Sequence, residues 1–89
     1  MSNSTNDRQE RYSFVLAPPP GQEMTVLFEP GAGEYVLMPG HSFRIAIFGS
    51  EDDRLELTHG PGYVTLWPSG GMHLEVIDER GRPVPLLGH

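Results

Sequence analysis

Two alternating runs separated by a polar turn make up residues 43–59, which read FRIAIFGSEDDRLELTH. In the first run Phe43, Ile45 and Ile47 occupy every second position, and in the second run Leu55 and Leu57 do the same. Successive side chains of a β-strand point to opposite faces, so this spacing predicts two strands with one apolar and one polar face each. The pattern therefore directs all five apolar residues toward a core.

The chain from Tyr12 onward repeats this arrangement of short apolar runs and turn clusters. The turns fall where glycine and proline gather, and the chain holds 11 glycines and 9 prolines. No interval between turns has the roughly 10 residues that a helix needs. The expected strands are Tyr12–Ala17, Met24–Glu29, Glu34–Met38, Phe43–Phe48, Arg54–His59, Tyr63–Trp67, Met72–Asp78 and a short Val84–Leu87.

Strands at this spacing predict an all-β fold, a small antiparallel β-sandwich of seven to eight strands, immunoglobulin-like or related. A chain of 89 residues has room for one domain. Residues 1–11 contain no apolar side chain after Met1. We therefore expect a disordered, flexible polar arm over residues 1–11 and a single β-sandwich domain over residues 12–89.

Two turn-containing segments resemble parts of bacterial immunoglobulin-like β-sandwich modules. Residues 37–45, LMPGHSFRI, are similar to the strand–Pro-Gly–strand step of such modules, and residues 77–84, IDERGRPV, resemble the Asp-x-x-Gly-x-Pro hairpin near their end. These modules share no active site. The resemblance therefore implies a sandwich fold and assigns no functional residue.

The charge balance sets aside several kinds of partner and chemistry. The chain carries six basic residues, all arginine, against twelve acidic residues, for a formal net charge of −6. Such a chain repels the phosphates of nucleic acids and of anionic membranes, so we expect neither as a partner. Lysine and cysteine are both absent, which excludes Schiff-base catalysis, thiolate chemistry and cysteine-bound metals.

The same features bear on localisation and cofactors. The polar first eleven residues do not resemble a secretory signal, and no segment reaches the roughly 20 apolar residues of a membrane span. Together with the lack of cysteine, this predicts a cytoplasmic protein. The Gly-x-Gly pairs at residues 31–33 and 60–62 precede strands rather than helices, so we expect no cofactor.

Histidines and carboxylates are the candidates for metal binding. His41, His59 and His73 lack the i, i+2 or i, i+4 spacing of ligands that share one element, so a small His-based metal- or ligand-binding site requires them to converge in the fold. The acidic loop Glu51–Asp53 lacks the alternating spacing of a calcium-binding loop. It is expected to be a solvated turn.

Catalysis has little basis in the sequence. Ser50 and Ser69 lie in turns outside any Gly-x-Ser-x-Gly motif. A catalytic triad is defined by geometry, so a small hydrolytic enzyme with a composite site is a second alternative. We assign no catalytic residue and expect no enzymatic activity.

Apolar residues out of phase with the core are the main anomaly of the sequence. Aromatic residues are enriched at protein interfaces, so such a set predicts a surface that docks on a protein partner or forms a homo-oligomer. Burial of both faces of a central strand, or a β-bulge, would also explain them. The leading hypothesis is a non-enzymatic protein-binding or self-assembling module. Its interface candidates are Trp67, Phe48, Tyr63, Leu27 and Ile77.

Overall fold

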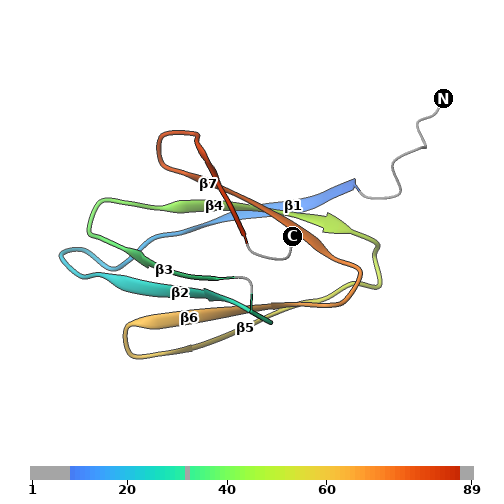
Figure 1. The fold of residues 1–89 in the computed structure, drawn as a ribbon, viewed down its shortest axis with the longest axis horizontal. Coiled ribbons are helices and arrows are strands. Elements are labelled where there is room, and N and C mark those ends of the chain that lie inside the picture. Colours follow the sequence, from blue (N-terminus) through green and yellow to red (C-terminus); the bar gives the residue numbers. More distant parts are fainter. Residues whose placement is uncertain (1–8, 32, 87–89) are drawn as a thin grey trace.

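The computed structural model of the protein describes residues 9–31 and 33–86. Within these ranges the chain forms β1 (Gln9–Leu16), β2 (Met24–Phe28), β3 (Gly33–Leu37), β4 (Phe43–Gly49), β5 (Leu55–Gly60), β6 (Tyr63–Pro68), β7 (His73–Asp78) and β8 (Pro83–Val84). Sheet A has the order β1-β4-β7-β8, sheet B has the order β3-β2-β6-β5, and the two lie face to face (Figure 1). The predicted all-β sandwich is confirmed. None of the described residues belongs to a helix long and apolar enough to cross a membrane.

The pairing of β2 with β6 is parallel, whereas the other pairings found between the described strands are antiparallel. Each of these two strands also forms a hairpin, β2 with β3 and β6 with β5. Parallel neighbours need a long crossover connection, which the excursion through β4 in sheet A supplies. Alternation along a strand says nothing about the direction of its neighbours, so the sequence did not reveal this exception to an antiparallel sandwich.

The first strand begins earlier than the sequence predicts. β1 starts at Gln9, whereas residues up to Arg11 were expected in the arm. The register passes from Glu10 opposite Phe48 to Tyr12 opposite Ile47, so Arg11 is the extra residue of a β-bulge. Main-chain pairing with β4 extends the strand here without apolar side chains. The rest of the predicted arm, residues 1–8, lies outside the described residues.

The core lies between the sheets and comes mainly from alternate residues of the inner strands. In β4, Phe43, Ile45 and Ile47 are buried as their spacing predicts. The rings of Phe28, Tyr35 and Phe43 contact one another with centroids 5.7–6.4 Å apart. The buried apolar residues are Val26, Phe28, Leu37, Phe43, Ile45, Ile47, Val64, Leu66, Met72, Leu74 and Val76.

The edge strand β5 departs from the predicted pattern. Leu55 packs against the core, but Leu57 leaves 45% of its surface exposed, so its predicted place in the core is wrong. Leu57 faces an open hollow that it shares with Val15 and Leu16 of β1, because the two edge strands do not close over each other. In β6, by contrast, residues 64–66 are all buried. The middle of this strand is therefore buried on both faces, whereas Tyr63 and Trp67 at its ends are exposed.

On the opposite side of the sandwich, one side chain forms a hydrogen bond from sheet B to the segment that follows sheet A. The Tyr35 hydroxyl on β3 donates a hydrogen bond to the main-chain carbonyl of Pro85, just after β8. Since β3 is an edge of sheet B and β8 an edge of sheet A, this bond links the two sheets directly. The two long sides of the sandwich therefore differ.

Leu66 and Leu57 are cross-strand partners and provide a matched test of the core boundary. We expect Leu66→Ala to lower the free energy of unfolding by about 2–5 kcal/mol, because it leaves a cavity. Leu57→Ala should cost about 1 kcal/mol or less, because much of that side chain is already in water. Urea unfolding followed by circular dichroism measures both. Equal losses of unfolding free energy in the two variants would contradict the placement of Leu66 in the core and Leu57 at its edge.

Candidate functional site

The five apolar residues predicted to form an interface divide between two surfaces. Leu27, Tyr63 and Trp67 lie on the outer face of sheet B, on β2 and β6. Phe48 and Ile77 lie on the outer face of sheet A, on β4 and β7. Because the core separates the sheets, these residues cannot form one patch. Each face has its own chemistry.

The outer face of sheet B exposes the larger apolar side chains. We call it the Trp67 face and define it by the outward residues of the four strands. Trp67, Tyr63 and Val36 are 44%, 43% and 50% exposed, whereas Leu27 is half-buried. The strand register puts Val36 and Tyr63 on either side of Thr25. The face consists of Thr25, Leu27, Glu34, Val36, Glu56, Thr58, Tyr63, Thr65 and Trp67.

Both aromatic rings of this face are held against the β5–β6 hairpin. The Trp67 indole nitrogen donates a hydrogen bond of 3.0 Å to the Thr58 hydroxyl. The Tyr63 ring covers Gly60, where a Cβ atom would come within 2.5 Å of a ring carbon. A side chain with a fixed orientation loses less conformational entropy when it binds a partner. The two rings are therefore preorganised for contact.

Carboxylates are the charged groups of the Trp67 face. Glu34 and Glu56 project from β3 and β5, and Glu29 follows the end of β2. The strands of sheet B contain neither arginine nor lysine. Arg54 precedes β5, but its guanidinium donates to two main-chain carbonyls of the β4–β5 turn, at 3.0 and 3.2 Å. The face is therefore aromatic and aliphatic with an acidic rim.

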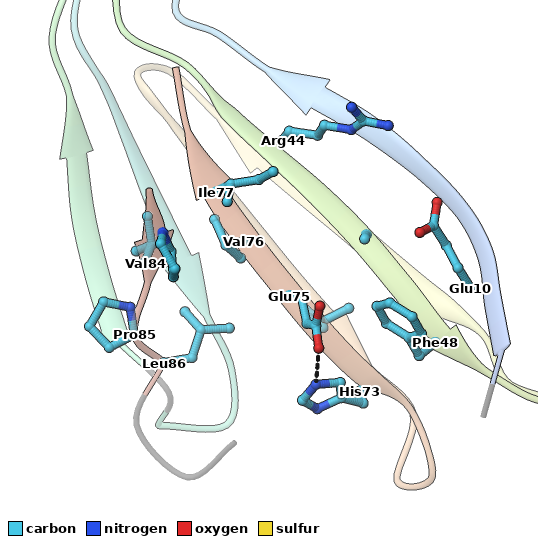
Figure 2. A pocket seen from close by; sticks show the side chains of 13 residues that line it. Glu10, Arg44, Phe48, His73, Glu75, Val76, Ile77, Val84, Pro85 and Leu86 are labelled. Atoms are coloured by element: carbon cyan, nitrogen blue, oxygen red, sulfur yellow. Dashed lines mark hydrogen bonds and ion pairs between the residues drawn. The ribbon is translucent and has the colours of Figure 1, made fainter. Parts of the chain in front are cut away.

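The outer face of sheet A carries a shallow groove of about 580 Å³ between β7 and the segment that follows β8 (Figure 2). Phe48, Ile77 and Ala46 contribute half-buried apolar surface to it, and Pro85 and Leu86 form a wall. These two interface candidates are thus less exposed than the rings of sheet B.

The polar groups of this groove bond to neighbours on the same sheet. The Nε2 atom of His73 lies 3.3 Å from a carboxylate oxygen of Glu75, the pair joined by the dashed line in Figure 2. The His73 ring also contacts that of Phe48, with centroids 5.8 Å apart. Arg44 donates to the Ser13 hydroxyl at 3.4 Å. The groove therefore mixes both signs of charge with apolar surface.

The three candidate histidines lie in different places. His41 belongs to the turn between β3 and β4, His59 to β5 of sheet B, and His73 to β7 of sheet A, and each lines a different hollow. Over residues 9–31 and 33–86, no group of three or more histidine or carboxylate side chains is placed to hold a metal ion. The geometry gives no support to a metal site formed by these histidines.

The acidic turn and the two candidate serines form a structural network around Asp53. One carboxylate oxygen of Asp53 accepts hydrogen bonds from the amide of Ser50 at 2.8 Å and from its hydroxyl at 3.4 Å. The other accepts from the Ser69 hydroxyl at 3.1 Å. Ser69 in turn accepts from the Arg54 amide at 3.0 Å. Asp53 thereby fastens the β4–β5 turn to the β6–β7 turn.

A substitution at Gly49 measures how much this network contributes to the stability of the fold. A Cβ atom at this buried position would lie 2.5 Å from a carboxylate oxygen of Asp53. We expect Gly49→Ala to displace that carboxylate and lower the free energy of unfolding by about 1–3 kcal/mol. Gly70→Ala is the control, because no atom lies within 4 Å of its added methyl group. Chemical denaturation measures the free energy of unfolding of both variants. Equal values would contradict the role of Asp53 in joining the two turns.

Two carboxylates with lowered pKa values hold the β7–β8 hairpin. A carboxylate oxygen of Asp78 accepts from the amides of Arg80 and Arg82, both at 2.9 Å. Glu79 accepts from the Ser42 amide at 2.9 Å and so joins the hairpin to the β3–β4 turn. The hydrogen bond from the Arg82 amide is the main cause of the lowered pKa of Asp78, and the hydrogen bond from the Ser42 amide is the main cause of the lowered pKa of Glu79. Both bonds favour the charged carboxylate.

The sign of this pKa shift predicts an acid-sensitive contribution of Asp78. Folding lowers the pKa of Asp78 below the ordinary value of 3.8 for an aspartate. The charged carboxylate therefore contributes its full stabilisation to the folded state above pH 3.8, and this contribution is lost as the pH falls through the lowered pKa. Asp78→Asn keeps an acceptor oxygen but removes the charge. We expect wild type to be more stable than this variant at neutral pH, with a difference that shrinks below pH 3.8. A pH-independent difference in urea midpoints would contradict the assignment.

Comparisons with known proteins assign no family to this chain. Neither protein-family models nor curated proteins nor solved structures gave a match. A function therefore has to be inferred from the residues of the chain itself, and the Trp67 face is the surface on which large exposed side chains and a consistent charge coincide.

Proposed function

We propose that this protein is a non-enzymatic protein-binding module that docks through the Trp67 face. The observation that carries the proposal is the exposure of Trp67 and Tyr63 on one outer sheet face, together with the contacts that fix both rings. The bound surface belongs to another protein or to a second copy of this chain. No chemical step is part of the proposed function.

The energetics of protein interfaces favour this face over the groove of sheet A. Tryptophan and tyrosine are the residues that most often dominate binding energy, because they bury large areas in few rotamers. Trp67 already forms the hydrogen bond that its indole nitrogen needs, so burial by a partner leaves no unpaired donor. In the groove, Phe48 and Ile77 are half-buried and offer less new surface.

Two further expectations from the sequence stay proposals. One is a relationship to bacterial immunoglobulin-like modules. It rests on the resemblance of residues 37–45 and 77–84 to parts of such modules. The other is a cytoplasmic location, which rests on composition alone.

A photo-crosslinking experiment in the native host tests the docking surface. A benzophenone amino acid in place of Tyr63 should give a defined protein adduct, and the same residue in place of Tyr12 should not. Tyr12 is a matched control because it is 51% exposed but lies on β1 of the other sheet. Equal adducts from both positions, or none from either, would contradict the proposal.

Trp67→Ala supplies the second arm of this test. It removes one exposed cross-strand contact and one hydrogen bond, so we expect it to lower the free energy of unfolding by only about 1–2 kcal/mol. It should nevertheless abolish the adduct formed from position 63. A variant that unfolds globally would place Trp67 in the core instead. A folded variant that still forms the adduct would remove Trp67 from the interface.

A further inference from the structure

Resting on this proposed function, we infer that the Trp67 face binds a cationic partner, an arginine- or lysine-bearing segment of another protein rather than a second copy of this chain. The evidence is a difference in charge between the two sheets, because sheet A carries both signs and the charged side chains on the outer face of sheet B are carboxylates. The strands of sheet A contain Arg11 and Arg44 but also three carboxylates, Glu10, Glu75 and Asp78. The four strands of sheet B contain no arginine or lysine but carry Glu34 and Glu56.

One of the two carboxylates is the direct neighbour of an aromatic anchor, and the other lies farther across the same face. Glu56 is the direct cross-strand partner of Trp67, and Glu34 lies in the same row of residues as Leu27 and Thr65. Tryptophan attracts a cation over its ring more strongly than the other aromatic residues. A guanidinium or ammonium group stacked on Trp67 would therefore also lie beside the Glu56 carboxylate. The two attractions act on the same group.

A second copy of the chain fits this face poorly. In a two-fold dimer the same patch of each copy meets the other, so Glu34 and Glu56 of both copies would enter one interface. Carboxylates buried against carboxylates lose their hydration and gain no counter-charge. The net charge of −6 on each chain adds repulsion at longer range. A cationic segment would instead supply a counter-charge to Glu34 and Glu56 and would be attracted by the net negative charge of the chain.

The only tryptophan of the chain allows the test to report on this face alone, because its fluorescence comes from position 67. The probes are alternating arginine–valine, serine–valine and glutamate–valine peptides of about eight residues, long enough to cross four strands spaced about 4.8 Å apart. We expect the arginine peptide to change the Trp67 emission and to bind best. Its affinity should fall about tenfold or more between roughly 20 and 300 mM salt, because exposed charges are screened.

Two double variants with the same change in net charge distinguish the effect of carboxylates on the Trp67 face from the effect of overall charge on peptide binding. Glu34→Gln with Glu56→Gln should weaken binding of the arginine peptide about fivefold or more. Glu10→Gln with Glu75→Gln, on the groove of sheet A, should change it less than about twofold. Equal weakening by both pairs would mean that net charge drives binding and would overturn the inference.

The remaining outcomes distinguish the inference from the proposed function. If the serine or glutamate peptide binds Trp67 as tightly as the arginine peptide, the face is a docking surface but the cationic partner is wrong. If the arginine peptide does not bind while crosslinking from position 63 persists, the inference fails alone. If peptide binding and crosslinking are both absent, the proposed function fails with it. A stable dimer that Trp67→Ala dissociates would also overturn the cationic partner.

Discussion

The parallel pairing of β2 with β6 is the constraint on which the rest of the structure depends. It joins two hairpins, β2–β3 and β5–β6, into one four-stranded sheet. Without it, sheet A would be covered by two separate two-stranded hairpins, and two-stranded hairpins have little stability of their own in water. It also places Tyr63 of one hairpin beside Thr25 and, across that residue, Val36 of the other. The broad outer face of sheet B is a product of this single junction.

The sequence predicted those parts of the fold that follow from the alternation of apolar and polar residues along a strand. The inner face of β4 and the all-β class depend on local alternation, so both could be predicted. Leu57 has the same spacing as Leu55, but its burial depends on whether another strand covers it, and the edge of β1 does not. The early start of β1 at Gln9 depends on main-chain pairing with β4, which leaves no pattern in side chains.

The candidate site was predictable in its residues but not in its arrangement. Trp67 and Tyr63 could be singled out because they are out of phase with Val64 and Leu66 on one strand. Their separation from Phe48 and Ile77 depends on which strands share a sheet, and no short-range signal in the sequence carries that information. The acidic character of one face likewise emerges only when β3 and β5 are placed on either side of β2 and β6.

The Tyr35–Pro85 hydrogen bond gives the sandwich a mechanical asymmetry. Hollows lie along both long sides, and this bond spans the one between β3 and the segment after β8, whereas β1 and β5 stand apart around the other. The direct hydrogen bond would hold the edges of the two sheets together more firmly on that side than between β1 and β5. Solvent would then enter more readily between β1 and β5, so amide protons next to that hollow should exchange sooner than those near the Tyr35–Pro85 bond.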